Sequence, residues 1–299
     1  MPRGGVGMAV FIQGLVSGVS IGCIYALVAL GFVLIYKATE IVNFAQGELM
    51  MVGGFFAFTF INLWHFPFYV GVPLAFCGTA IFGAALNHFI LRRLIGYSTF
   101  SIVLATVGLA TLMRSLASMV PGWGTETHTI DIPLAGQVLR IGGIAIAYEH
   151  LIVIVVTILL VSAIYLFFTF TRLGVAMQAT AQSQLAAGYV GIPVRSMFSM
   201  VWGLSAGVAC IAGVLLAPIA YIHINVGYIG LKAFPAAVLG GFGSIPGAVL
   251  GGLIIGIVEE LAGLYLPPGF KSVAAYVVLL LALMIRPQGM LGISLKTRV

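Results

Sequence analysis

Charged side chains are scarce in this sequence. Only 7% of its 299 residues are Asp, Glu, Lys or Arg, against about a quarter in an ordinary soluble domain. Hydrophobic residues make up 62%, more than a soluble core could bury without leaving a large exposed apolar patch. The composition therefore predicts an integral membrane protein. Its net charge of +6 then indicates basic residues on the cytoplasmic side, so no nucleic-acid partner is expected.

The residue patterns of catalytic and metal sites are missing as well. There is no G-x-x-x-x-G-K-[ST] motif, and the glycine-rich stretch GGFGSIPG has no lysine to meet nucleotide phosphates. No Ser/His/Asp set, catalytic carboxylate pair or Cys/His cluster is recognisable. The three cysteines, Cys23, Cys77 and Cys210, lie in hydrophobic runs and are interpreted as small apolar residues. We therefore expect a protein that is not an enzyme and has no catalytic residue, metal site or cofactor of its own.

Long hydrophobic runs fill most of the chain. A helix needs about 20 apolar residues to cross the hydrocarbon region of a bilayer. The runs predict an all-α, polytopic membrane protein with about eight transmembrane helices in a single transmembrane domain, residues 1–299. The eight runs are Met8–Tyr36, Leu49–Trp64, Phe68–Leu91, Phe100–Val120, Leu151–Phe170, Met197–Tyr221, Phe234–Ile257 and Ser272–Ile285.

Positive charges indicate how the chain is oriented. Basic residues follow the first, third and fifth runs, at Lys37, at Arg92–Arg93 and at Arg172 with Arg195, and all fall on one side if the N-terminus is external. That side should be cytoplasmic. The opposite side then carries the external loop 121–150. Within this loop, the residues of Thr127–Glu149 alternate between apolar and polar and are interrupted by glycines, which predicts a small hairpin.

The seventh run, KAFPAAVLGGFGSIPGAVLGGLIIG, is dense in glycine and proline. Eight simple crossings would leave the basic C-terminal tail outside. We therefore expect a discontinuous element near 234–252, with a half-helix over Phe234–Gly241, a turn at Gly243–Ser244 and a complete span from Ile245. A broken helix is tolerated at membrane depth only where it is buried in protein or lines a cavity. The tail, which this arrangement returns to the cytoplasm, carries Arg286, Lys296 and Arg298.

A second interruption is the polar stretch in IVNFAQGELMMVGGFF, residues 41–56, which follows 29 uncharged residues, Met8 to Tyr36. In transporters, interrupted segments point to the translocation path. Helix ends at such breaks offer unpaired N–H or C=O groups to a polar solute. An interfacial loop with Asn43 as helix cap is the alternative interpretation. The candidate path residues are Asn43, Gln46, Glu48, Gly240, Gly241 and Gly243.

Other polar residues within the runs are few. Arg114 lies six residues from the Val120 end of its run, so we expect its guanidinium to reach the membrane surface in a structural role. A role in binding the solute is the alternative. Glu259 and Glu260 lie at the predicted outer edge and are interpreted as a solvated pair. The runs show no chain of buried Asp, Glu or His, which a proton-coupled carrier would often need.

The cytoplasmic segment 171–196 is too long for a tight turn and too polar for a span. Val175–Tyr189 is rich in good helix formers and predicts a short helix, ended by Gly191 and Pro193. It has almost no Lys or Arg, which argues against a helix lying on lipid. Its alanines and glycines favour close docking into a groove of a protein partner.

This chain resembles the LivH-type permease subunits of branched-chain amino acid ABC importers. The resemblance covers nearly the whole chain. It rests on GFVLIYKATEIVNFAQGELMMVGGF, TRLGVAMQATAQSQLAAGYVGIPV, GVLLAP, KAFPAAVLGGFGSIPGAVLGGLIIGIVEEL and the closing RPQGMLG. It implies a multi-pass subunit of a bacterial plasma (inner) membrane. The implied partners are a second, LivM-like permease, two cytoplasmic ATPase subunits that bind the ATP, and a periplasmic solute-binding protein.

The resemblance also implies that Ala179–Gly188 is the coupling helix that seats in an ATPase. Family members often carry His where Gln46 stands, and acidic residues where Ser183 and Gln184 stand. These departures bear on the identity of the solute and of the ATPase. The coupling residues are Ala179, Gln182, Ser183, Leu185, Ala187 and Gly188.

The implied function is that of a permease subunit forming part of the path for branched-chain or related amino acids, switched between outward and inward openings by partner ATPases. Related permeases serve urea, short amides or aromatic acids, so those solutes are alternatives. Another class of function is an ATP-independent channel or an ion-coupled carrier for a small polar solute, and a third is a non-transporting scaffold. The missing relay of ionisable residues argues against the carrier, and the helical cytoplasmic segment argues against the lone channel.

Overall fold

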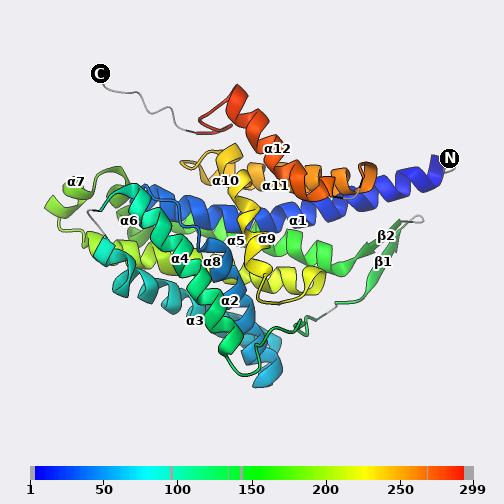
Figure 1. The fold of residues 1–299 in the computed structure, drawn as a ribbon, viewed down its shortest axis with the longest axis horizontal. Coiled ribbons are helices and arrows are strands. Elements are labelled where there is room, and N and C mark those ends of the chain that lie inside the picture. Colours follow the sequence, from blue (N-terminus) through cyan, green and yellow to red (C-terminus); the bar gives the residue numbers. More distant parts are fainter. Residues whose placement is uncertain (1–3, 95–96, 134, 142–143, 268, 293–299) are drawn as a thin grey trace.

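The computed structural model describes residues 4–94, 97–133, 135–141, 144–267 and 269–292. Within them the chain is mostly helical, with one two-stranded hairpin (Figure 1), so the all-α prediction is confirmed. The elements are α1 (Gly4–Thr39), α2 (Gln46–Phe58), α3 (Phe68–Phe89), α4 (Thr99–Met119), β1 (Val138–Ile141), β2 (Ile144–Ala147), α5 (Tyr148–Phe170), α6 (Arg172–Gln182), α7 (Gln184–Tyr189), α8 (Val194–Ala220), α9 (Val226–Leu231), α10 (Ala233–Gly240), α11 (Ile245–Tyr265) and α12 (Phe270–Ile285).

Among the described residues, six helices are long and apolar enough to cross a membrane: α1, α3, α4, α5, α8 and α11. The second and eighth predicted runs are helical but shorter. α2 has 13 residues and continues into a π-helical turn, Thr59–Leu63, and α12 has 16 residues. All eight hydrophobic runs therefore contain helix, as expected for a polytopic membrane protein.

The seventh run is broken where the sequence predicts it. α10 ends at Gly240, and Gly241 has φ of 96°, a backbone conformation that only glycine adopts without strain. Ser244 then caps α11, because its Oγ accepts the Gly247 N–H at 3.1 Å. The half-helix, the turn and the new helix from Ile245 are thus confirmed. A further short helix, α9, precedes them and was not predicted.

Two helices form the centre of the bundle. In the most apolar stretches of α1 and α8, 89% and 83% of the residues are buried, against 22–28% in α3, α4 and α5. Figure 1 shows α1 running through the length of the molecule with the other helices around it. The peripheral helices therefore present apolar side chains outward, as helices that face lipid or another membrane subunit do.

Glycines allow α1 and α11 to pack backbone against backbone. A Cβ added at Gly22 would lie 2.8 Å from the Leu253 Cα, and one at Gly252 would lie 2.6 Å from the Ala26 Cα. Gly256 faces Gly22 in the same way. Small residues let membrane helices approach this closely and gain dispersion contacts that larger side chains would block. The two helices run antiparallel, so α11 returns the chain to the end where α1 begins.

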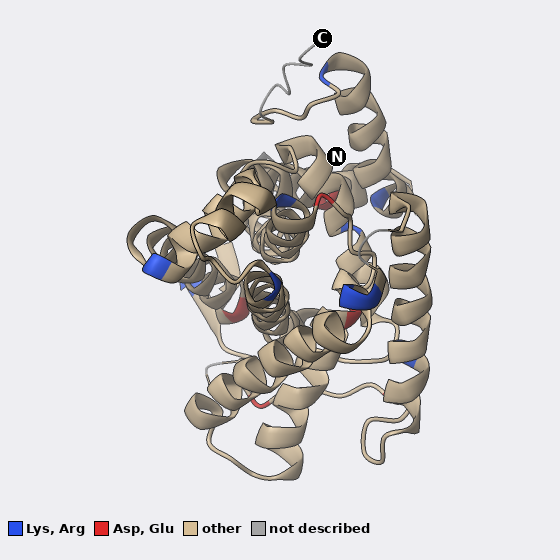
Figure 2. Ribbon diagram, turned by 90° about the vertical axis from the view of Figure 1, so that its left-hand side faces the viewer, with Lys and Arg blue, Asp and Glu red and all other residues tan. Residues whose placement is uncertain are grey.

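The two ends of the bundle differ. α6 and α7 lie at one end, and the β1–β2 hairpin lies at the other, near the start of α1 (Figure 1). Strands Val138–Ile141 and Ile144–Ala147 pair antiparallel, which confirms the predicted hairpin; its turn residues 142–143 lie outside the described residues. His128 in the same loop also pairs with Ile222, just after α8. Seen from the α6–α7 end, the ribbon carries few charged residues (Figure 2).

The basic residues that oriented the predicted topology gather at one end. Arg92, Arg93 and Arg195 line the same surface depression. The chain that follows α12 also lies near the end of α1, since the Met290 N–H donates to the Leu239 carbonyl at 2.8 Å and the Phe242 ring lies 4.7 Å from that of Tyr36. The start of the C-terminal tail therefore shares an end with Lys37, as predicted. Lys296 and Arg298 lie outside the described residues.

Candidate functional site

The candidate site begins where α1 ends. Glu40 has φ of 56°, which stops the helix, and five further residues pass before α2 starts at Gln46. The Asn43 Oδ1 accepts the Ala45 N–H at 3.0 Å, and the Thr106 hydroxyl of α4 accepts the Phe44 N–H at 3.2 Å. Asn43 is fully buried and, within the described part of the chain, its Nδ2 has no hydrogen-bond partner. The stretch thus lies inside the bundle, which argues against the interfacial-loop alternative.

Gln46 of α2 contacts the buried hydroxyl of Ser205, which links α2 to α1 and α8. Ser205 of α8 donates to the Gln46 Oε1 and to the Gly31 carbonyl of α1, both at 3.0 Å. The Gln46 amide in turn donates to the Ser205 carbonyl at 3.4 Å. The side chains of Gln46 and Ser205 are fully buried, and a Cβ at Gly31 would collide with the Gln46 amide. The first turn of α2 is therefore fixed against α1 and α8 by polar contacts.

Glu48 forms an ion pair with Arg114, a partner that could not be recognised from the sequence. Its carboxylate is 2% exposed and accepts from the Arg114 guanidinium of α4. The guanidinium carbon lies 3.9 Å from the centre of the Tyr228 ring of α9, a cation–π contact. The expectation that Arg114 extends to the membrane surface is therefore wrong. The guanidinium turns inward because a buried Glu48 carboxylate without a charged partner would be strongly destabilising.

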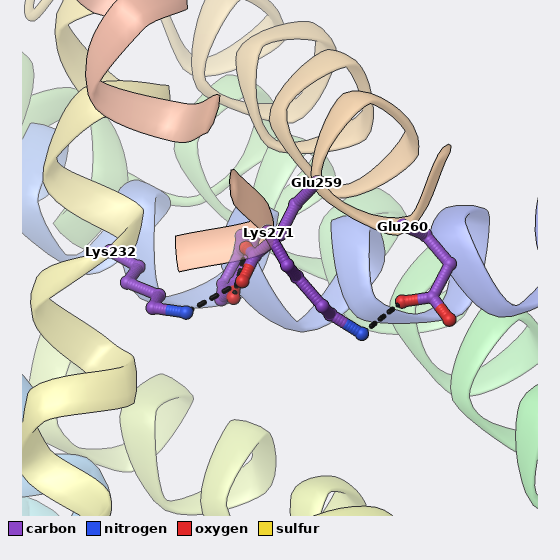
Figure 3. A network of polar contacts seen from close by, with 5 residues as sticks. Lys232, Glu259, Glu260 and Lys271 are labelled. Atoms are coloured by element: carbon purple, nitrogen blue, oxygen red, sulfur yellow. Dashed lines mark hydrogen bonds and ion pairs between the residues drawn. The ribbon is translucent and has the colours of Figure 1, made fainter. Parts of the chain in front are cut away.

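A second buried carboxylate holds the broken segment in place. Glu259 of α11 accepts from Lys232, between α9 and α10, at 2.6 Å and from the Tyr25 hydroxyl of α1 at 2.7 Å. Figure 3 shows this pair beside the contact of Lys271 with Glu260, also 2.6 Å. Glu259 is 3% exposed, so its interpretation as part of a solvated pair is wrong. The side chains of Glu260 and Lys271 are more exposed, at 17% and 44%.

Glu259→Gln should destabilise the protein markedly. The substitution removes the charge that neutralises Lys232 while leaving Lys232 partly buried, at a cost of about 3 kcal/mol in unfolding free energy. Thermal unfolding of the purified protein in detergent measures the effect. Glu260→Gln is the matched control and should cost at most about 1 kcal/mol, because that pair is closer to solvent. Equal losses for the two variants would contradict the structural role given to Glu259.

A cavity of about 280 Å³ lies on the α6–α7 side of the buried stretch. It reaches inward as far as Thr106, whose hydroxyl holds the turn before α2. At its other end it reaches Gln184, the first residue of α7. One cavity thus extends from Thr106, which contacts the turn before α2, to the first residue of α7. Its polar and aromatic lining includes Glu40, Asn87, Thr99, Thr106, Gln184 and Trp202.

The three glycines predicted to lie on the translocation path are not among the residues that line this cavity. Gly240 and Gly241 are buried at the α10–α11 break and pack against the segment after α12, where the Leu291 N–H donates to the Gly240 carbonyl at 3.1 Å. Gly243 belongs to the same turn. The break meets the α2 stretch through aromatic rings, since Phe234 lies 5.5 Å from Phe44. The two predicted groups are therefore neighbours through apolar contacts, and the polar contacts of Asn43, Gln46 and Glu48 are made with other elements.

The segment 171–196 forms two helices, α6 and α7, where the sequence predicts one over Val175–Tyr189. The helices separate at Ser183, whose Oγ accepts the Ala186 N–H at 3.2 Å and so starts α7. Leu185 and Tyr189 of α7 are 76% and 88% exposed. Among the proposed coupling residues, Ala187 is buried and unavailable to a partner. Gln182, Ser183 and Gly188 are exposed, and Ala179 is half-buried.

Three residues of this site were not predicted from the sequence: Ser205, Arg114 as the partner of Glu48, and Tyr228. Ser205 had no distinguishing signal in an apolar helix. Arg114 had one, because a charge within a membrane helix usually has a buried partner. Among the described residues, no three His, Cys, Asp or Glu side chains come together as a metal site requires.

Comparison with known proteins gives consistent matches along the chain. The family described as "Branched-chain amino acid transport system / permease component" matches residues 14–285. A "High-affinity branched-chain amino acid transport system permease protein BraD" of Pseudomonas aeruginosa is 32% identical over 94% of this chain and 96% of the relative. The corresponding LivH protein of Escherichia coli strain K12 is 30% identical over the same shares, 94% and 96%.

More distant matches agree. A "Probable branched-chain amino acid transport permease protein LivH" of Methanocaldococcus jannaschii is 30% identical over 90% of this chain and 89% of the relative. Among solved structures, one described as "PsaBC from Streptococcus pneumoniae in complex with Fab" aligns with a TM-score of 0.51 and 16% identity, covering 92% of this chain and 91% of that chain. At that identity the match shows a shared fold.

Proposed function

The chain belongs to the family of branched-chain amino acid transport system permease components, and on that premise we propose that it is the permease subunit of an ATP-driven importer for branched-chain or related amino acids. It contributes one part of the membrane path. ATP is bound and hydrolysed by two partner ATPases, a LivM-like permease completes the membrane part, and a periplasmic binding protein delivers the solute. The protein resides in the bacterial plasma (inner) membrane.

The cavity between α7 and the start of α2 carries this proposal. Its lining includes Gln184, which belongs to the exposed segment that a cytoplasmic partner would bind. It also includes Thr106, whose hydroxyl accepts a hydrogen bond from the buried polar turn before α2. A displacement of α7 therefore changes the shape of a space that leads to the candidate path. This supports a permease driven from the cytoplasmic side.

The proposed mechanism is alternating access. ATP binding closes the two ATPases on each other, and the exposed side chains of α7, including Leu185 and Tyr189, carry that movement into the membrane bundle. Two elements change their contacts. One is the polar stretch at the start of α2, with Asn43, Gln46 and Glu48, and the other is the broken segment around Gly240, Gly241 and Gly243. Broken helices provide hinges at these positions because their backbone is not constrained by a continuous ladder of hydrogen bonds.

In this mechanism, the permease and the periplasmic binding protein together determine which solute is transported. Gln46 takes part in hydrogen bonds with Ser205 on α8, so it acts mainly in positioning α2. Urea, short amides and aromatic acids are the alternative solutes of the same mechanism, and a competition assay with the reconstituted importer distinguishes them. An ATP-independent carrier is the alternative of another class, although both Glu48 and Glu259 are ion-paired.

Purification from the native membrane in mild detergent tests the proposed assembly. We expect two P-loop ATPases and a second permease to be recovered with this chain, and mass spectrometry identifies them. Recovery of the chain alone, together with solute flux in liposomes that contain no ATP, would show that it works as an independent channel or carrier.

A further inference from the structure

The Glu48–Arg114 ion pair lies where α2, α4 and α9 meet. Glu48 belongs to the first turn of α2 and Arg114 to the C-terminal half of α4. The backbone of Gly227 in α9 lies directly against the carboxylate, where a Cβ would collide with both oxygens. The ring of Tyr228 covers one face of the guanidinium. Three elements distant in the sequence thus surround two opposite charges.

The pair leaves hydrogen-bonding capacity unused. Within the described part of the chain, the Glu48 Oε2 and the Arg114 Nε are buried and have no hydrogen-bond partner. The other buried carboxylate differs, since both Glu259 oxygens accept a hydrogen bond, one from Lys232 and one from Tyr25. Buried ionised groups are normally satisfied in full, so an unfilled acceptor beside an unfilled donor marks a place where a polar ligand can bind.

The two unused atoms are complementary to a zwitterion. A carboxylate oxygen accepts from an ammonium group, and a guanidinium N–H donates to a carboxylate. We propose that Glu48 and Arg114 form a recognition site for the α-amino and α-carboxyl groups of an amino acid in transit. The solute replaces part of the mutual contact of the pair, Glu48 taking the ammonium and Arg114 the carboxylate. This assignment rests on the proposed function as an amino acid permease.

The surroundings of the pair fit that role. Tyr228 is 54% exposed, so its ring offers an apolar surface beside the guanidinium for an aliphatic side chain. One face of α4 packs on the bundle, through residues such as Ile102, Leu109 and Met113, whereas the rest of the helix is largely exposed. A helix held along a single face can separate from α2 and open the space between the two charges.

A purely structural pair is the competing explanation, in which Arg114 only fastens α4 to α2. Reversing the two charges distinguishes the explanations. In the double variant Glu48→Arg/Arg114→Glu the ion pair is retained, but the charges face the solute in the opposite order. Uptake restored by this reversal would identify a purely structural pair, whereas a site that holds the amino acid in one orientation does not regain uptake.

Leucine uptake by the assembled importer in ATP-loaded liposomes is the measurement. Glu48→Gln should lower uptake about tenfold or more, as expected for the loss of a charged hydrogen bond to the solute, and the reversed double variant should stay as low while still retaining its ATPases. Lys271→Gln, which removes a charge from the more exposed pair, is the control and should transport normally. Uptake restored by the double variant would overturn the proposal.

If the double variant does not assemble, thermal unfolding of the unsubstituted protein with leucine and two analogues tests the proposed binding site. The permease–ATPase complex without its binding protein is heated with equal millimolar concentrations of leucine, 3-methylbutylamine, which lacks the carboxylate, or 4-methylpentanoate, which lacks the amine. Leucine should raise the Tm more than either analogue, because only leucine engages both charges. Equal shifts, or none, would overturn the proposal.

The outcomes also separate this inference from the proposed function. An importer that takes up leucine, but whose reversed double variant is fully active, retains its function and loses only the assigned binding site. An assembled importer that takes up no amino acid at all would contradict the proposed function itself.

Discussion

Replacing Leu185 with arginine in α7 should abolish ATP-driven uptake and release the ATPases from the complex. Leu185 and Tyr189 are four residues apart on one face of α7 and are 76% and 88% exposed. Exposed apolar side chains at this spacing can act together as anchors in the groove of a partner protein. An arginine at the centre of such an anchor would remove about 2 kcal/mol or more of docking free energy. Co-purification of the ATPases, followed by uptake in liposomes, measures the effect.

Two controls make this result specific to α7. Val138→Arg replaces a similarly apolar side chain, 48% exposed, in the hairpin at the opposite end of the bundle and should leave the ATPases bound. Leu185→Met keeps the apolar contact and should leave uptake near normal. If Leu185→Arg retained its ATPases and its uptake, α7 would not be the coupling segment.

Gly252→Val should prevent stable folding. A Cβ at Gly252 would lie 2.6 Å from the Ala26 Cα, so α1 and α11 would have to separate along an interface where backbone packs against backbone. Overpacking against backbone costs about 3 kcal/mol, and here the two helices cannot relax by rotating a side chain. The amount of folded protein extracted from membranes, with its Tm in detergent, measures the loss.

The matched control is Gly108→Val in α4. Gly108 is exposed, and a Cβ there meets no other atom within 4 Å. This variant should accumulate and unfold like the unsubstituted protein. Equal losses at Gly108 and Gly252 would mean that helix propensity, and not the close approach of α1 and α11, determines the effect.

The helical architecture could be predicted from the sequence because its cause is local. Apolar runs of membrane length become helices, since an unpaired backbone cannot remain in lipid. The break between α10 and α11 was also predictable, because Gly241 must adopt a positive φ and Ser244 and Pro246 then start a new helix. The break between α6 and α7 was missed because Ser183 is a weaker signal in a run of good helix formers.

The partners of the buried charges could not be predicted in the same way. Glu48 and Arg114 are 66 residues apart in sequence, and Tyr25 and Glu259 are 234 apart, so no helical periodicity connects them. Their pairing depends on which helix faces which, and that is set by glycine contacts such as Gly22 with α11. An isolated charge in an apolar run still predicts that a partner exists, although not which residue it is. The sequence therefore identified Glu48 as a candidate and placed Arg114 wrongly at the surface.

Leucine entry with and without ATP distinguishes a permease driven by its partners from an independent path. The purified assembly is reconstituted in liposomes with its binding protein outside and either ATP or a non-hydrolysable analogue inside, and entry of radiolabelled leucine is followed. We predict accumulation against a gradient only with hydrolysable ATP, and no entry through this chain alone. Equal leucine entry with and without ATP would contradict this prediction, because the path through this chain would then need no partner to open it.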